Sequence, residues 1–179
     1  MENQGLIVTI ALALLGYFAT YLNNLRLAKR ADKLKFVTAQ IDELYGPLYV
    51  ITQTGQILFQ ALLFKGIKKN RLTESEDSPD SADEASDWRI WVQEVFQPLN
   101  EQLGHIIINK AHLIIEQEMP QCLKRFLAHS AGYKAVIKKW RAGDFTDNSS
   151  VIHFPTEIEE YAEISFLKLR KQQRKLIGR

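Results

Sequence analysis

The sequence predicts an all-α protein in which an N-terminal transmembrane helix continues into a cytoplasmic antiparallel bundle of about four helices. An uncharged apolar run near the N-terminus indicates the first part. Apolar residues at helical spacing through most of the remainder indicate the second, and no stretch alternates with a period of two for long enough to suggest a strand. The expected segments are a transmembrane anchor at 1–24, a juxtamembrane long helix at 25–66, an acidic flexible loop at 67–87 and the remaining bundle helices at 88–179.

The apolar run at 5–22 is long enough to cross a bilayer, since about 20 apolar residues match a hydrocarbon core of about 30 Å. No Lys or Arg precedes it and several follow it, which is the reverse of a cleaved signal peptide. The positive-inside rule places the N-terminus outside and the body in the cytoplasm. The alternative is a buried helix of a soluble protein, but the run is apolar on all its faces, and a surface helix would show a polar stripe.

Small residues share one face of this run. Spacings of four, three and four bring Thr9, Ala13, Gly16 and Thr20 together on a helix. Small faces let helix backbones approach closely in lipid, where packing drives association. The face therefore predicts self-association, although small residues are common in transmembrane helices in general.

Composition excludes some classes of function and agrees with the cytoplasmic location expected for the body. The net charge of +2 is too mild to indicate a nucleic-acid-binding protein, so no nucleic-acid partner is expected. Cys122 is the only cysteine, so the chain can form neither an intrachain disulfide nor a multi-cysteine zinc site. A reducing cytoplasm fits this usage.

A sustained apolar seam runs from Leu34 to Leu62 at three-four spacing, as in helices buried in bundles and coiled coils. In the same phase the seam continues back into the small face of the anchor, so the anchor and the first cytoplasmic helix are expected to form one rod. Gly46 and Pro47 interrupt this rod, and we expect a kink there because proline lacks the N–H of an α-helical hydrogen bond.

The acidic segment at 67–87 has the composition of a solvated loop, with an acidic docking tail as the alternative. A second long helix is expected from Trp88 to about residue 118. It contains Pro98 in a sequence, EVFQPL, that echoes ELYGPL around Pro47. We interpret the echo as a packing device by which two antiparallel helices nest their bends together.

The third helix is expected to begin at Pro120 and to stop at Gly143, and the fourth to run from about Pro155 to Ile177. Up-down order would place the acidic start of the fourth helix at the far pole and return its basic end to the membrane. Anionic lipid headgroups would favour such a cluster, although a solvated helix end is an equally good interpretation. The expected membrane-surface residues are Arg26, Lys29, Arg30, Lys33, Lys35, Arg170, Lys171, Arg174 and Lys175.

The histidines are the main candidates for chemistry. Asn109, His112, His129 and Tyr133 form a candidate polar site between two helices. A metal-binding module or enzyme that uses His112 and His129 is an alternative, but the chain lacks HExxH, a cysteine pair and His-x-x-x-His. It also lacks Gly-x-Ser-x-Gly, a P-loop and GxGxxG, so we expect no catalytic residue and no cofactor.

Several segments carry a resemblance: ELYGPLY at 43–49, WVQEVFQPLNEQL at 91–103, NKAHLI at 109–114, EMPQCLKRFLAHSAGYKAVIKKW at 118–140 and HFP at 153–155. Together they resemble a group of small bacterial single-pass membrane proteins with an N-terminal anchor, a Leu-Tyr-Gly-Pro-Leu element and a helical cytoplasmic body. The resemblance implies this architecture and the bacterial inner membrane. It transfers no catalytic residue.

These observations predict a membrane-tethered helical scaffold or interaction protein without catalytic activity. Its expected partners are the lipid bilayer and either further copies of itself or another protein. An alternative of a different class is a membrane-disrupting effector of a bacterial stress or phage-defence system, whose spans cluster and breach the bilayer.

Overall fold

The structure is a computed structural model that describes residues 2–64, 80–147 and 149–178 of the 179-residue chain, with side chains from Ile10 to Phe64 and from Ala85 onward. Within these ranges the regular structure is entirely helical, which confirms the all-α part of the predicted fold class. The helices form about four rods, as expected. Most of the predicted acidic loop lies outside the described residues.

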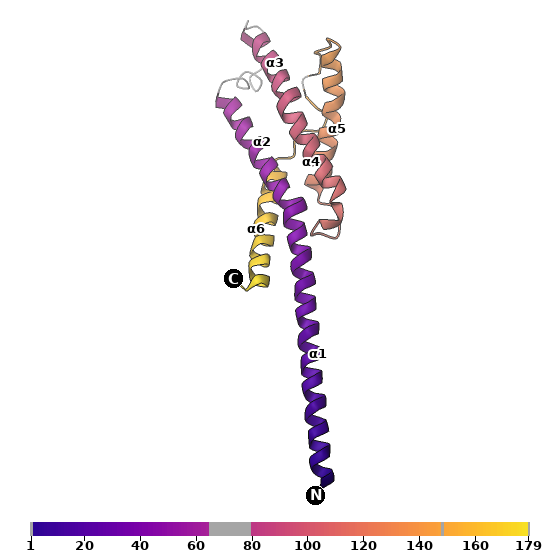
Figure 1. The fold of residues 1–179 in the computed structure, drawn as a ribbon. Coiled ribbons are helices and arrows are strands. Elements are labelled where there is room, and N and C mark those ends of the chain that lie inside the picture. Colours follow the sequence, from indigo (N-terminus) through magenta and orange to yellow (C-terminus); the bar gives the residue numbers. More distant parts are fainter. Residues whose placement is uncertain (1, 65–79, 148, 179) are drawn as a thin grey trace.

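Two long rods dominate the arrangement (Figure 1). The first consists of α1 (Glu2–Gln40), η1 (Ile41–Tyr45) and α2 (Gly46–Phe64). The second runs back beside α2 and consists of α3 (Asp80–Trp91), η3 (Val92–Phe96) and α4 (Gln97–Asn109). The N-terminal half of α1 projects far beyond the rest of the molecule, so the chain has the form of a helical body on a single-helix stalk.

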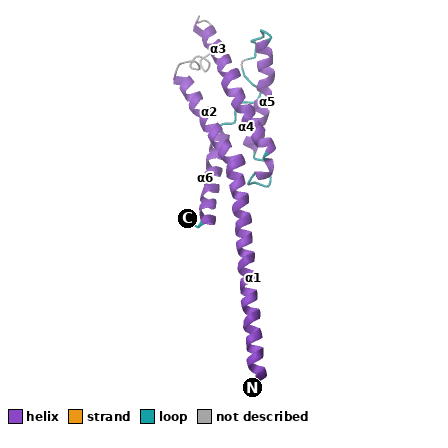
Figure 2. Cartoon of the chain, in the orientation of Figure 1, coloured by secondary structure: helices purple, strands orange, loops and turns teal. Residues whose placement is uncertain are grey.

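The other two rods complete the body (Figure 2). After a short 3-10 turn, η4 (Ala111–Leu113), helix α5 (Gln121–Arg141) packs against α4, and α6 (Glu157–Ile177) packs against the end of α1, η1 and α2. Helix α5 begins after Pro120 and stops before Gly143, whose φ of 82° is left-handed, as the sequence predicted. The end of α6 returns to α1, where Arg30 Nε donates to the Leu176 carbonyl at 2.7 Å.

Both interior prolines follow a π-helical turn. The Gly46 N–H bonds to the Ile41 carbonyl in η1, and the Gln97 N–H bonds to the Val92 carbonyl in η3. A π turn shifts the hydrogen-bond register by one residue, which accommodates the proline that follows without breaking the rod. The two similar sequences around Pro47 and Pro98 thus have the same local structure.

The two π-helical turns do not nest together. The ring of Phe96 in η3 lies 6.4 Å from the ring of Phe59, near the far end of α2, whereas Glu43 in η1 is paired with Lys110, just past the end of α4. The bends are therefore offset along the rods. This is a correction to the nesting expected from the sequence.

Two helix boundaries also differ from expectation. Helix α3 begins at Asp80, inside the predicted loop. Helix α4 ends at Asn109, about ten residues early. Side chains of the first rod hold the backbone beyond it: Gln40 Nε2 donates to the Leu113 carbonyl at 2.9 Å, and the Ile115 N–H donates to the Tyr45 hydroxyl at 3.0 Å.

The segment between α5 and α6 folds back along α5. Trp140 Nε1 donates to the Asp147 carbonyl at 2.7 Å, and Ser150 Oγ donates to the His129 carbonyl at 3.3 Å. Helix α6 consequently begins level with the first turns of α5, where Glu157 pairs with Arg125 at 3.2 Å. The acidic start of α6 therefore does not lie at the far pole, contrary to the sequence-based expectation.

The buried apolar side chains form two clusters. The larger one joins the end of α1, η1, α4, α5 and α6 around the fully buried Tyr45 and Phe126. The smaller one joins Leu62 of α2 to Trp88, Val92 and the second half of α5. The predicted seam supplies both clusters, since Val37, Ile41, Leu44, Leu48 and Leu62 are all buried.

Candidate functional site

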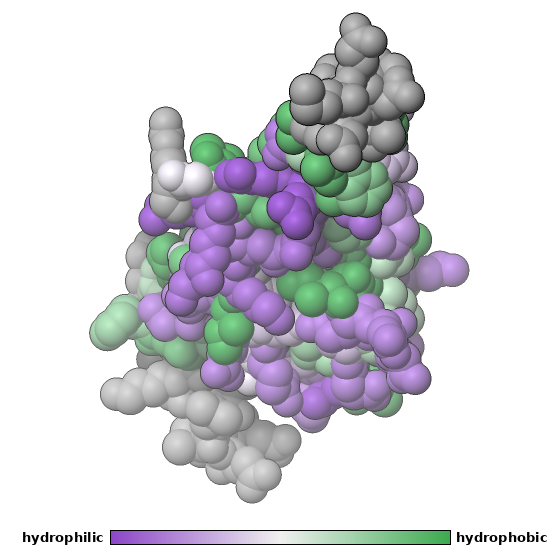
Figure 3. Space-filling view, turned by 90° about the horizontal axis from the view of Figure 1, so that it is seen from below, coloured by the Kyte–Doolittle hydropathy of each residue, from purple (hydrophilic) through white to green (hydrophobic). Residues whose placement is uncertain are grey.

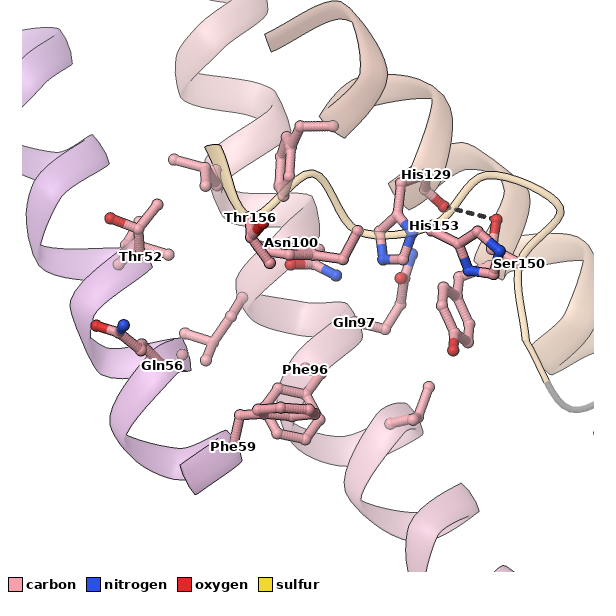
Figure 4. Close-up of a pocket in the computed structure, with 18 of the residues that line it drawn as sticks. Thr52, Gln56, Phe59, Phe96, Gln97, Asn100, His129, Ser150, His153 and Thr156 are labelled. Carbon is pink, nitrogen blue, oxygen red and sulfur yellow. Dashed lines mark hydrogen bonds between the residues drawn. The ribbon is translucent and has the colours of Figure 1, made fainter. Parts of the chain in front are cut away.

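A cleft of about 290 Å³ separates the two apolar clusters. Its walls come from α2 on one side, η3 and α4 in the middle, and α5 with the returning segment 149–156 on the other (Figure 4). Six aromatic side chains line it: Phe59, Trp88, Phe96, Phe126, Tyr133 and Phe154. Ligand sites in proteins are typically clefts of this kind, mostly apolar with a few placed polar groups.

Gln97 is the central polar group of the cleft. It lies in the first turn of α4, directly after η3, and only 5% of its surface is exposed. Its amide Nε2 donates to the Ser130 carbonyl at 3.1 Å and to Glu101 Oε1 at 3.3 Å. Both partners can only accept, which fixes the orientation of the amide. Gln97 Oε1 is buried and has no hydrogen-bond partner among the described residues.

His129 lies on α5, on the opposite side of Gln97 from α2 (Figure 4). Its Nδ1 is 2.6 Å from the Ile152 carbonyl, and its ring meets Tyr133 and Phe154 edge-on at 5.0 and 5.5 Å. Burial lowers the pKa of His129, and the charge of His153 adds to this effect. The ring is therefore neutral near pH 7, with the proton on Nδ1 facing the carbonyl and Nε2 left as an acceptor.

Three further ionisable side chains line the cleft, those of Tyr133, His153 and Glu159. Glu159 stands in the first turn of α6, and burial raises the pKa of its carboxyl group. The described lining contains no Lys and no Arg. The cleft therefore has no side chain that is cationic at every pH, and its hydroxyl and amide groups can donate as well as accept.

A second polar cluster lies outside the cleft, at the junction of η1, α6 and the α4–α5 connection. The Ile115 N–H donates to the Tyr45 hydroxyl, which lies 2.9 Å from the Tyr161 hydroxyl, and Tyr161 donates to Glu116 at 2.9 Å. Each donor in this series of hydrogen bonds points toward the Glu116 carboxylate. Because Tyr45 is fully buried, these hydrogen bonds satisfy a hydroxyl that would otherwise be costly to bury.

The candidate polar site expected from the sequence is not one site. His129 and Tyr133 line the cleft, but Asn109 and His112 are exposed near the end of α4, beside Glu43 and Lys110. The sequence placed them together because His112 was expected on a continuous helix, which in fact ends at Asn109.

Metal ligands do not converge in the described part of the chain. It holds no group of three or more His, Cys, Asp or Glu side chains placed to bind a metal ion. His112 and His129 are separated as described above, so the structure does not assemble the metal or enzyme site considered as an alternative. Burial raises the pKa of the Cys122 thiol, which keeps it protonated and weakly nucleophilic.

The remaining predicted residues are the small residues of α1 and the basic residues of α1 and α6. Thr9 falls outside the residues whose side chains are described, while Ala13, Gly16 and Thr20 are exposed on α1, and Thr20 Oγ1 donates to the Gly16 carbonyl at 2.8 Å. The two groups of basic residues are near one another, on α1 and on the end of α6. Within the described side chains, no helix is both long and apolar enough to qualify as a membrane span.

Comparisons with protein-family models, with curated proteins and with solved structures each found no match to this chain. The resemblance noted from the sequence therefore stays a prediction. Sequence reasoning also missed Gln97, Ser150 and Gly55 as cleft residues. The one available signal was Gln97 itself, a polar residue at an interior position of the EVFQPL motif.

Proposed function

We propose that this chain is a membrane-tethered helical scaffold, anchored through α1 and without catalytic activity of its own. The observation that supports it most strongly is the state of α1, which projects alone from the body with every described side chain from Ile10 to Lys33 exposed. Large apolar residues lie on all sides of this stalk, among them Leu12, Leu14, Leu15, Tyr17 and Phe18 at 58–73% exposure. Exposed apolar surface of this extent marks a membrane or protein interaction site.

The body has a surface suited to a charged lipid layer on the side from which α1 emerges. Seen from that side, it is mostly hydrophilic (Figure 3). Basic residues on α1 and α6 approach one another there, because Arg30 bonds to the end of α6 and Gln173 Nε2 donates to Thr38 Oγ1 at 3.0 Å. Anionic headgroups would offset the repulsion between the two basic groups, at about 1 kcal/mol for each Lys or Arg near the surface. In this proposal the basic groups lie at the cytoplasmic face of a bacterial inner membrane.

Membrane attachment is tested by expressing the full-length chain in bacteria and separating membranes by high-speed sedimentation and carbonate extraction. We expect the unaltered chain to remain with the membranes and the double variant Leu14→Arg/Leu15→Arg to be released. The matched control is Ile108→Arg/Ile164→Arg, which adds the same charge at exposed apolar positions of the body and should stay with the membranes. Recovery of the unaltered chain in the supernatant would overturn the proposal.

Orientation and self-association need separate measurements. A tag at the C-terminus should resist protease added to intact spheroplasts and become sensitive after lysis, since the body lies inside. In detergent, the mass of the complex should exceed that of one chain and fall for Gly16→Leu, which places a bulky side chain on the small face. A single-chain mass for the unaltered protein would remove self-association and leave the anchor intact.

A further inference from the structure

The cleft around Gln97 has the features of a binding site, independent of the membrane anchor. From its geometry we infer that it binds a neutral, largely aromatic molecule that carries a hydroxyl or N–H group and donates this hydrogen to Gln97 Oε1. Three properties of the cleft carry this assignment: an acceptor without a partner among the described residues, an aromatic lining without Lys or Arg, and space beside a helix glycine.

The acceptor decides which group the ligand must carry. Gln97 is 95% buried, and its Nε2 is already committed to Ser130 and Glu101, so the amide cannot turn to hide its oxygen. A buried acceptor without a partner costs about 1–3 kcal/mol. A donor on the ligand removes that cost, whereas a ligand with only acceptors at this point does not.

The lining decides the rest of the ligand. Phe59 and Phe96 lie edge to face at 6.4 Å across the gap between α2 and η3 (Figure 4), and the Trp88 ring lies 5.9 Å from Phe96. Aromatic rings favour such edge and offset contacts with a further ring. An anion would find no Lys or Arg in the described lining, and the charge of His153 is set there against the carboxyl group of Glu159. The ligand is therefore neutral and carries aromatic rings.

Gly55 leaves room on the α2 side of the cleft. It lies on the cleft side of α2, and a Cβ added there would meet no atom within 4 Å. Glycine in a helix interior costs about 0.5–1 kcal/mol relative to alanine, so this position gives up stability for room. The cleft volume of about 290 Å³ is close to the lower end for ligand pockets, about 300 Å³, and suits a molecule of two rings.

The test uses photo-labelling of the full-length chain in detergent, because mapped cross-links distinguish the cleft from the micelle. The probe is 4-(hydroxymethyl)benzophenone, which is neutral, has two rings and carries one hydroxyl donor. Its matched partners are 4-(methoxymethyl)benzophenone, which lacks the donor, and 4-carboxybenzophenone, which is an anion. Peptides that carry the label are identified by mass spectrometry.

We expect the hydroxymethyl probe to label peptides from α2, α4 and α5 that contain cleft residues, and each partner probe to label them at least about fivefold less. Gly55→Leu should reduce cleft labelling at least tenfold by filling the space. Thr54→Leu adds the same side chain at the neighbouring exposed position of α2 and should leave labelling unchanged.

The isosteric variant Gln97→Met addresses the acceptor directly. It should label equally with the hydroxymethyl and methoxymethyl probes, since the oxygen that distinguishes them is gone. Should this variant fail to fold, Gly55→Leu and the comparison of the two neutral probes on the unaltered chain still test the inference. Labelling confined to α1, equal labelling by the two neutral probes, or labelling unaffected by Gly55→Leu would each overturn the inference.

Discussion

Gly132 and Ser150 offer the sharpest test of how the returning segment is held on α5. Gly132 lies on the face of α5 that Ser150 crosses, and a Cβ added at Gly132 would overlap Ser150 Oγ and lie 3.6 Å from Ser150 Cβ. Ser150 is 3% exposed and bonds to the His129 carbonyl. The segment therefore cannot give way to a new methyl group without losing a buried contact.

The magnitude for Gly132→Ala follows from two opposing terms. Overpacking costs about 1–3 kcal/mol, and alanine gains about 0.5–1 kcal/mol over glycine within a helix. The single variant should therefore be destabilised by about 0.5–2 kcal/mol. In a Ser150→Gly background the overlapping oxygen is absent, so the same substitution should stabilise by about 0.5–1 kcal/mol. The coupling free energy between the two positions is then about 1–3 kcal/mol.

The measurement is urea unfolding of the four proteins of the cycle in one detergent, followed by tryptophan fluorescence. All three tryptophans lie in the body and not in the stalk, so the signal reports unfolding of the body. Additivity of the two substitutions within about 0.5 kcal/mol would show that Ser150 does not pack on Gly132. That result would also remove the structural basis for the wall of the cleft formed by segment 149–156.

Three further outcomes are expected from the same unfolding measurement. Tyr161→Phe should cost about 1–3 kcal/mol, because it leaves the buried Tyr45 hydroxyl without its acceptor; an unchanged free energy of unfolding would contradict the hydrogen-bond chain. Burial lowers the pKa of His129 below its ordinary value of 6.5. The contribution of His129 to the free energy of unfolding should therefore be complete above pH 6.5 and be lost as pH falls through the lowered pKa. Replacement of His129 by glutamine should flatten this dependence of stability on pH. Gly46→Ala should destabilise, since its Cβ would lie 2.6 Å from a backbone carbonyl oxygen, whereas Gly55→Ala should stabilise by about 0.5–1 kcal/mol; the reverse order would contradict the geometry of η1.

The sequence predicted the helices well because their burial is periodic. The spacing of the seam identified Val37, Leu44 and Leu48 as core residues, and all three are at most 2% exposed. The prolines were correctly placed as irregular points of the rods. Their form as π-helical turns was not predictable, since a proline is compatible with a kink, a break or a shifted hydrogen-bond register.

The cleft was not predictable from the sequence, because its key contacts are long-range and specific. The bonds of Gln97 to Ser130 and of Ser150 to His129 join positions more than 20 residues apart. Nothing in a local pattern shows that the chain after α5 folds back along it, since extended segments have no periodic signature. The early end of α4 has the same cause: Gln40 and Tyr45 hold backbone that lies about 70 residues away.

The segment of α1 proposed as the membrane anchor and the α2 wall of the cleft lie on one rod, on opposite sides of η1. Helix α6 holds α1 below η1 through Arg30 and Gln173, while α2 above η1 forms one wall of the cleft. A ligand changes the spacing of α2 and α4 only to the extent that it binds one spacing more tightly than another. Helix α6 also packs against η1 and α2 and contributes Glu159 to the cleft, so a movement of α2 would reach α6 as well as the bend at η1. The two proposals stay separable by experiment because photo-labelling reports on the cleft and sedimentation with membranes reports on α1.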